Sequence, residues 1–330
     1  MNEFLAGILN SINGVVHNYG WAIVIFTILV KVLLFPFDYK SRKSMRKMQA
    51  IQPEVSRLQR KYANDKEKLN QKTMELYKQE NVSPMAGCVP LLLSMPILFA
   101  MFGAMRLIAN TELAKQAIDF LVNSAQINEG WLWVRNLWMP DSPFYAAVAD
   151  QANLRQVPTE VWQTVFATLD ATKVEFLAGL GEGIAITAEN IDGDMIFAAL
   201  SQNTAYIGQM ELWATMPRVN LIFMQLNIFA NPNGWFLLPL LSVATQFLLM
   251  AVQPQTMATG DAQAASTNKM MKYFMPFFSL MICFSYNAGF ALYWVVSNLV
   301  ACVLGYGMNK YFEAQEKKKP IETIGEGSIK

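Results

Sequence analysis

The stretch that decides the fold is WAIVIFTILVKVLLFPF, which runs from Trp21 to Phe37. About 20 helical residues cross the hydrocarbon core of a bilayer, so this stretch is long and apolar enough to span it. Lys31, midway along, is its only ionisable side chain. A lone cation inside a membrane helix is energetically costly and typically marks a functional site. The stretch therefore predicts a membrane-spanning helix that carries a candidate functional residue.

The composition agrees with a membrane protein. Of 330 residues, 53% are hydrophobic and 15% are charged, whereas soluble domains carry about 25% charged residues. We expect an all-α integral membrane protein with five spans, at residues 20–37, 85–106, 233–252, 273–286 and 289–308. Only Asn287 and Ala288 separate the last two spans, which we expect to form a tight helical hairpin.

Lysine and arginine are distributed unevenly between the connecting segments. Residues 38–84 contain 12 basic and 6 acidic residues, and the tail at 309–330 contains the run Lys317 to Lys319. The positive-inside rule places both in the cytoplasm, together with the loop at 253–272. Residues 107–232 contain 5 basic and 13 acidic residues and are expected outside, where residues 1–19 form an interfacial helix. The N-terminus is thus expected outside, with no cleaved signal peptide, and the C-terminus inside.

The first cytoplasmic segment is expected to form a helical hairpin. Apolar residues recur at three- and four-residue steps from Met45 to Tyr62, which predicts one helix bent at Pro53. A second helix should begin at Asn64, with Glu67 completing a capping box. The hairpin has a basic face that suits anionic lipid headgroups, ribosomal RNA or acidic proteins, formed by Lys43, Arg46, Lys47, Arg57, Arg60 and Lys61. The alternative is a solvated face that only sets the topology.

The outer segment at 107–232 is too long for a connector and too polar for the membrane. We expect an extra, mostly helical domain with helices near 160–180 and 190–201, separated by turns at 181–183 and 192–194. The single histidine, His17, and the three cysteines have no metal-ligand spacing, and residues 190–194 lack the pattern of a calcium loop. We therefore expect no metal and no cofactor.

Polar residues on four spans are expected at similar depth. Lys31 lies about 10 Å inside the cytoplasmic end of its span, at 1.5 Å per residue. Thr27 shares its face one turn away, and Ser94 and Gln246 are expected at about 10–14 Å, with Asn298 slightly deeper. A water-filled cavity in the inner leaflet would need such a set. Alternatively, Lys31 extends to the headgroups and the others hydrogen-bond between helices.

Two long stretches resemble the YidC membrane protein insertases. They are KMQAIQPEVSRLQRKYANDKEKLNQKTMELYKQENVSPMAGCVPLLLSMPILFAMF (Lys47 to Phe102) and NAGFALYWVVSN (Asn287 to Asn298). WLWVRNLWMPDSPFY and FMQLNIFANPNGWFLLPLLSVATQF are weaker matches on either side of the outer domain. The resemblance covers the membrane part and the hairpin, but not residues 146–210.

The resemblance implies an insertase of the bacterial cytoplasmic membrane, whose five helices enclose a hydrophilic groove open to the cytoplasm and to lipid. The family places a basic residue, usually arginine, on the first of these spans, and TILVKVLLFP puts Lys31 there. Ser94 stands where relatives commonly have glutamine. Unlike arginine, lysine is a point charge whose pKa falls readily on burial, so its role requires a wet groove.

The mechanism expected from this resemblance involves no catalysis. Lys31 attracts acidic flanks of a nascent membrane protein into a groove formed with Thr27, Ser94, Gln246 and Asn298, and the apolar segment partitions into lipid. The expected partners are nascent membrane proteins and anionic lipids, with the ribosome and the Sec translocon as further candidates and no DNA. A secondary transporter or channel is the alternative, although the spans contain no Asp or Glu and the halves no repeat. An enzyme would need a nucleophile with a base or paired carboxylates, which the spans lack.

Overall fold

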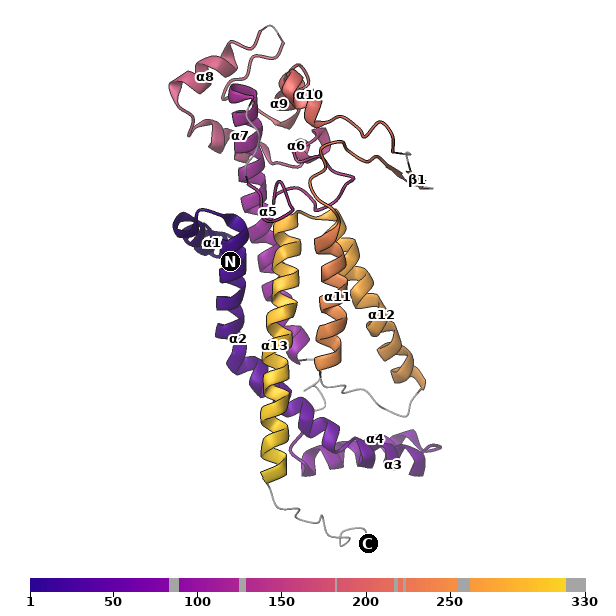
Figure 1. Ribbon diagram of the computed structural model, residues 1–330. Coiled ribbons are helices and arrows are strands. Elements are labelled where there is room, and N and C mark those ends of the chain that lie inside the picture. Colours follow the sequence, from indigo (N-terminus) through magenta and orange to yellow (C-terminus); the bar gives the residue numbers. More distant parts are fainter. Residues whose placement is uncertain are drawn as a thin grey trace.

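The computed structural model describes residues 1–82, 89–124, 129–181, 183–216, 219–221, 224–253 and 262–318. Long helices form a bundle, short helices form a small domain at one end, and a helical hairpin crosses the other end (Figure 1). The bundle consists of α2 (Tyr19–Ala50), α5 (Val89–Asn123), α11 (Leu237–Val252), α12 (Ala262–Ser285) and α13 (Ala288–Lys318). Its most extensive packing joins α11 to α13 and α12, and α13 to α2.

Three of the described helices are long and apolar enough to cross a membrane. These are α2, α5 from Met95 onward, and α13, while α11 and the Lys272–Ser285 part of α12 are apolar but shorter. Because α12 packs mainly against α11, its aromatic side chains lie largely exposed, with 58% of Tyr273 and 61% of Phe277 accessible. In a membrane protein, side chains of this kind face lipid.

The long helices do not end where their apolar stretches end. The first span is predicted at residues 20–37, and the helix α2 that contains it continues to Ala50; the second is predicted at residues 85–106, and α5 continues to Asn123. Both extensions are rich in good helix formers and lack glycine and proline, so nothing in their sequence stops the helix. Helix α2 therefore connects the apolar part of the bundle to the helical hairpin, and helix α5 connects it to the small domain.

The helical hairpin of α3 and α4 begins later than predicted. The single helix expected from Met45 to Tyr62 is interrupted at Ile51, and α3 (Gln52–Lys61) starts there with Pro53 in its first turn. Proline lacks a backbone N–H but fits a first turn, which explains a new helix in place of a bend. The partner helix α4 (Lys66–Gln79) is capped by Asp65, whose carboxylate accepts a hydrogen bond from the Lys68 amide at 3.0 Å, and not by Asn64 as predicted.

The small domain surrounds the far end of α5. It contains α6 (Gln151–Arg155), α7 (Thr159–Phe166), α8 (Ala171–Ala178), α9 (Gly193–Leu200) and α10 (Thr204–Gln209). The helix predicted at 160–180 is two helices, because Asp170 caps a new one, and Asp192 caps α9 where a turn was expected. Gly193 is required, since a Cβ there would lie 2.3 Å from the Leu154 carbonyl oxygen.

The remaining described elements are the helix α1 and a short β-hairpin. Helix α1 (Asn2–Val16) packs against α2 and α5 through Ala6 and Leu9, and its Phe4 and Val15 are exposed. The strands β1 (Val219–Leu221) and β2 (Met224–Leu226) pair antiparallel, so the expected all-α fold is correct except for this short hairpin.

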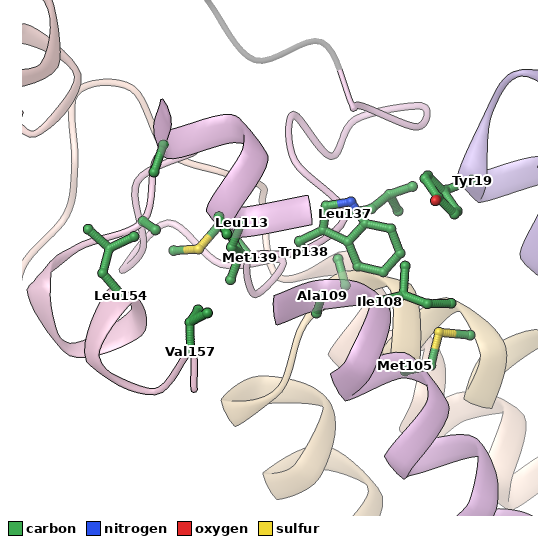
Figure 2. Close-up of a cluster of buried hydrophobic side chains, with 14 of the residues drawn as sticks. Tyr19, Met105, Ile108, Ala109, Leu113, Leu137, Trp138, Met139, Leu154 and Val157 are labelled. Atoms are coloured by element: carbon green, nitrogen blue, oxygen red, sulfur yellow. The ribbon is translucent and has the colours of Figure 1, made fainter. Parts of the chain in front are cut away.

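The hydrophobic core is continuous from the bundle into the small domain. Figure 2 shows Trp138 lying over Ile108 and Ala109 of α5, with Tyr19 of α2 beside it. The rings of Tyr19 and Trp138 meet edge to face, with centroids 4.9 Å apart. The same cluster includes the fully buried Trp162 of α7. This shared core holds the outer domain firmly on the membrane helices.

Candidate functional site

Lys31 lies half-buried on α2, within the apolar part of the helix. It interacts electrostatically with Asp38, two turns further along the same helix, and Asp38 interacts in turn with Arg42. The charge of Lys31 is therefore partly balanced from its own helix. Thr27, one turn before Lys31, is fully buried, and its hydroxyl donates a hydrogen bond to the Ile23 carbonyl at 2.6 Å.

The structure brings Gln246 and Asn298 together. The Asn298 side-chain amide donates to Gln246 Oε1 at 3.1 Å and to Thr245 Oγ1 at 3.3 Å, and both Gln246 and Asn298 are 7% exposed. This polar contact links α11 to α13. Gln246 and Asn298 therefore form a hydrogen bond between helices, which was the predicted alternative to lining a water-filled cavity. Buried amides in apolar surroundings must be bonded, and here they bond each other. Ser94 lies in α5, but its side chain falls outside the described residues.

Two arginines of α2 hold three helices together: Arg46, which belongs to the predicted basic face, and Arg42, which was not among the predicted site residues. Arg42 is 7% exposed and donates to the carbonyl oxygen of Val252, the last residue of α11, at 3.4 Å. Asn309 of α13 donates to the same oxygen at 2.9 Å. Helix C-terminal carbonyls lack partners within the helix, so these donors cap α11. Gly305 makes room for the Arg42 guanidinium, since a Cβ there would lie 2.5 Å from Nη2.

Arg46 continues this contact one turn further along α2. Its guanidinium donates to the Asn309 carbonyl at 3.1 Å and to Glu316 at 3.2 Å, and it stacks 5.2 Å from the ring centroid of Phe312. Arg46 is therefore engaged by α13. The other predicted residues of the basic face, Lys43, Lys47, Arg57, Arg60 and Lys61, are exposed. These five side chains are accessible to a binding partner.

At the outer end, a buried carboxylate fastens the helices to a loop. Asp141 is fully buried and accepts hydrogen bonds from the Leu238 amide at 2.6 Å, the Trp235 amide at 2.9 Å and the Trp133 indole at 3.0 Å. Amides at a helix start are unsatisfied within the helix and favour a negative charge. Asp141 thus caps α11 from a loop about a hundred residues earlier.

The adjoining loop caps α13 in the same way. The Ala288 and Gly289 amides donate to the carbonyls of Met139 and Leu137, at 2.9 and 2.8 Å. Asn233, also fully buried, donates to the carbonyls of Asn136, Met139 and Pro140 and so holds this loop in shape. One hydrogen-bonded loop thus caps the starts of α11 and α13, and the polar residues Gln246, Asn298 and Asn309 lie further along these helices.

Comparison with known proteins gives the family. The profile of the family described as 60Kd inner membrane protein matches residues 11–177 and 195–317. These ranges include most of residues 146–210, which the resemblance to the YidC insertases does not cover. Only the segment between these ranges interrupts the match, at the loop between α8 and α9.

Several curated proteins named Membrane protein insertase YidC are similar to part of the chain. The Fusobacterium nucleatum protein is 49% identical over 106 residues, which make up 32% of this chain and 52% of that protein. The Clostridium perfringens protein is 42% identical over 139 residues, 42% of this chain and 52% of that protein. The Laribacter hongkongensis protein is 38% identical over 139 residues, which make up 42% of this chain and 22% of that protein. The chain spans about half the length of the shorter relatives. Because the family profile matches most of the sequence, the chain belongs to the 60Kd inner membrane protein (YidC) family.

Proposed function

We propose that the protein is an insertase that places nascent membrane proteins into the bilayer. The observation that carries the proposal is Lys31, a single cation half-buried in the apolar part of α2, together with the match to proteins named as insertases. The helices α2, α5, α11, α12 and α13 serve as five spans. The short α11 and the short apolar part of α12, Lys272–Ser285, cross with the help of local bilayer thinning.

The proposed orientation follows from charge. The basic hairpin and the tail lie in the cytoplasm, and the acidic outer domain lies outside with the N-terminus. The loop that caps α11 and α13 then lies on the outer side, where its dense hydrogen bonding blocks water. The half that contains Lys31 opens to the cytoplasm. We place the protein in the bacterial cytoplasmic membrane.

The proposed groove is formed by Lys31, Thr27, Ser94, Gln246 and Asn298. Without a client, the side-chain amides of Gln246 and Asn298 hydrogen-bond to each other. A client backbone amide can replace one of the two partners, and this exchange of hydrogen bonds changes the free energy little. Lys31 attracts a client carboxylate, and the apolar segment of the client then leaves the groove for lipid.

The proposed partners are nascent membrane proteins and anionic lipid headgroups. The five exposed residues of the predicted basic face, at 43, 47, 57, 60 and 61, suit the negative inner leaflet. The ribosome and the Sec translocon are further proposed partners through the same surface. Insertion needs no bond cleavage, since burial of the client's apolar segment drives the transfer.

Reconstitution into vesicles tests this function against the alternative of a solute transporter or channel. We expect a single-span client with an acidic flank to become protease-protected at the flank when protein is present, with no uptake of small solutes above that of protein-free vesicles. A protein carrying Asp194→Ala, which changes an exposed side chain and leaves the groove residues and the capping loop intact, serves as a matched preparation. Solute flux without client protection would show that the protein is a transporter or channel.

A further inference from the structure

We propose that a cavity between the outer domain and the end of α12 binds an ammonium group, supplied by the headgroup of an outer-leaflet lipid. The cavity has a volume of about 230 Å³. Its walls include the aromatic rings of Phe144, Tyr145, Phe229 and Phe284 and two polar residues, Asp150 and Asn227. A water molecule occupies about 30 Å³ of liquid, so the space admits a larger group.

The cavity is lined by one carboxylate, that of Asp150. It accepts the Asn153 amide at 2.8 Å as the cap of α6, and its oxygens can accept further hydrogen bonds. Asn227 Oδ1 has no accessible surface and therefore does not take part in the site. A carboxylate in the wall of the cavity favours a donor with positive charge.

The aromatic walls favour the same class of ligand. Cations bind over aromatic faces, and quaternary or primary ammonium groups are recognised by cages of several rings. Four of the cavity's walls are such rings, and Phe144 and Phe284 meet edge to face with centroids 6.3 Å apart. Burial and the nearby Asp150 charge raise the pKa of the Tyr145 hydroxyl, which agrees with a carboxylate beside the ring. An anion would be repelled by the Asp150 carboxylate, and an apolar ligand would give that carboxylate no hydrogen bond.

The position of the cavity indicates a lipid as the source. Phe284 belongs to α12, next to the helix end at Ser285, and the exposed aromatic residues of this helix face lipid. One wall is thus a membrane helix and the others belong to the outer domain. An aminophospholipid headgroup lies at this level of the bilayer, whereas a free amine would have to come from solution.

The test uses the full chain in lipid nanodiscs and a variant that removes only charge. Asn caps helices as well as Asp does, so Asp150→Asn should keep α6. Asp170→Asn is the matched control, because Asp170 caps α8 in the same way but is exposed and lines no part of this cavity. We expect phosphatidylethanolamine to raise the melting temperature over phosphatidylglycerol by about 2–4 °C in the wild type and in the control variant, but not in Asp150→Asn.

Free ethanolamine and choline, added to phosphatidylglycerol nanodiscs, separate the two sources. Stabilisation by the lipid at matched bulk concentration, with little from the free amines, supports the headgroup. Stabilisation by the free amines alone would overturn the lipid source. A lipid difference that persists unchanged in Asp150→Asn, or no difference in the wild type, would overturn the site. None of these results depends on whether the protein inserts clients.

Discussion

Asp141→Ala is expected to lower the free energy of unfolding by about 3–5 kcal/mol. The substitution leaves the Leu238 and Trp235 amides and the Trp133 indole without their shared acceptor and removes a side chain that is fully buried. It also removes the negative charge at the start of α11. Thermal denaturation in detergent micelles should show a melting temperature lower by about 6–20 °C.

Two variants make this result specific. Asp141→Asn keeps one carbonyl acceptor and the shape of the side chain, so its loss should be smaller than that of Asp141→Ala. Asp194→Ala removes an exposed aspartate of the same domain that pairs with Arg155, and we expect little change from it. If Asp141→Ala has the same melting temperature as the wild type, the loop does not hold the starts of α11 and α13 as described.

Lys31→Ala is expected to slow insertion of clients with acidic flanks by about tenfold, which corresponds to about 1.4 kcal/mol. Attraction between unit charges near a protein surface reaches about 4 kcal/mol at 4 Å, and the interaction with Asp38 offsets part of it. Lys31→Arg keeps the charge and should keep most of the rate. Reconstituted vesicles and a protease-protection assay give both values.

Clients with neutral flanks are the control for Lys31. Their insertion relies on apolar partitioning alone, so the alanine variant should insert them at the wild-type rate. Equal slowing of acidic and neutral clients would indicate a packing defect in α2. An unchanged rate for acidic clients would show that Lys31 does not attract them.

The membrane part could be read from the sequence because its signals are local. Apolar runs such as Trp21 to Phe37 predicted the helices α2, α5, α11, α12 and α13, and depth counted along the spans brought Gln246 and Asn298 to similar levels. What depth could not show is which neighbour each side chain would bond. Two amides near one level can line water or pair, and the helix rotation that decides between them depends on packing across the bundle.

The contacts that close the two ends were not predicted because they join distant segments. Asp141 and Leu238 are 97 residues apart, and Arg42 and Val252 are 210 residues apart. Arg42 and Arg46 looked like any residues of a basic cytoplasmic stretch, and only their packing against Gly305 and Phe312 distinguishes them from exposed neighbours such as Lys43. Nothing local in the Asp-Ser-Pro sequence at 141–143 indicated which helix it would cap.

The central claim is that a client's flank passes the face of α2 that carries Lys31. Photo-crosslinking in vesicles tests it most directly, with a photoreactive phenylalanine analogue placed at Phe35, one turn beyond Lys31 on the same face. The matched probe replaces Leu33, which is 75% exposed and points to another side of the helix. The account predicts client adducts through the acidic flank at position 35 and mainly lipid adducts at position 33. Lipid adducts alone at position 35, or equal client adducts at both positions, would contradict it.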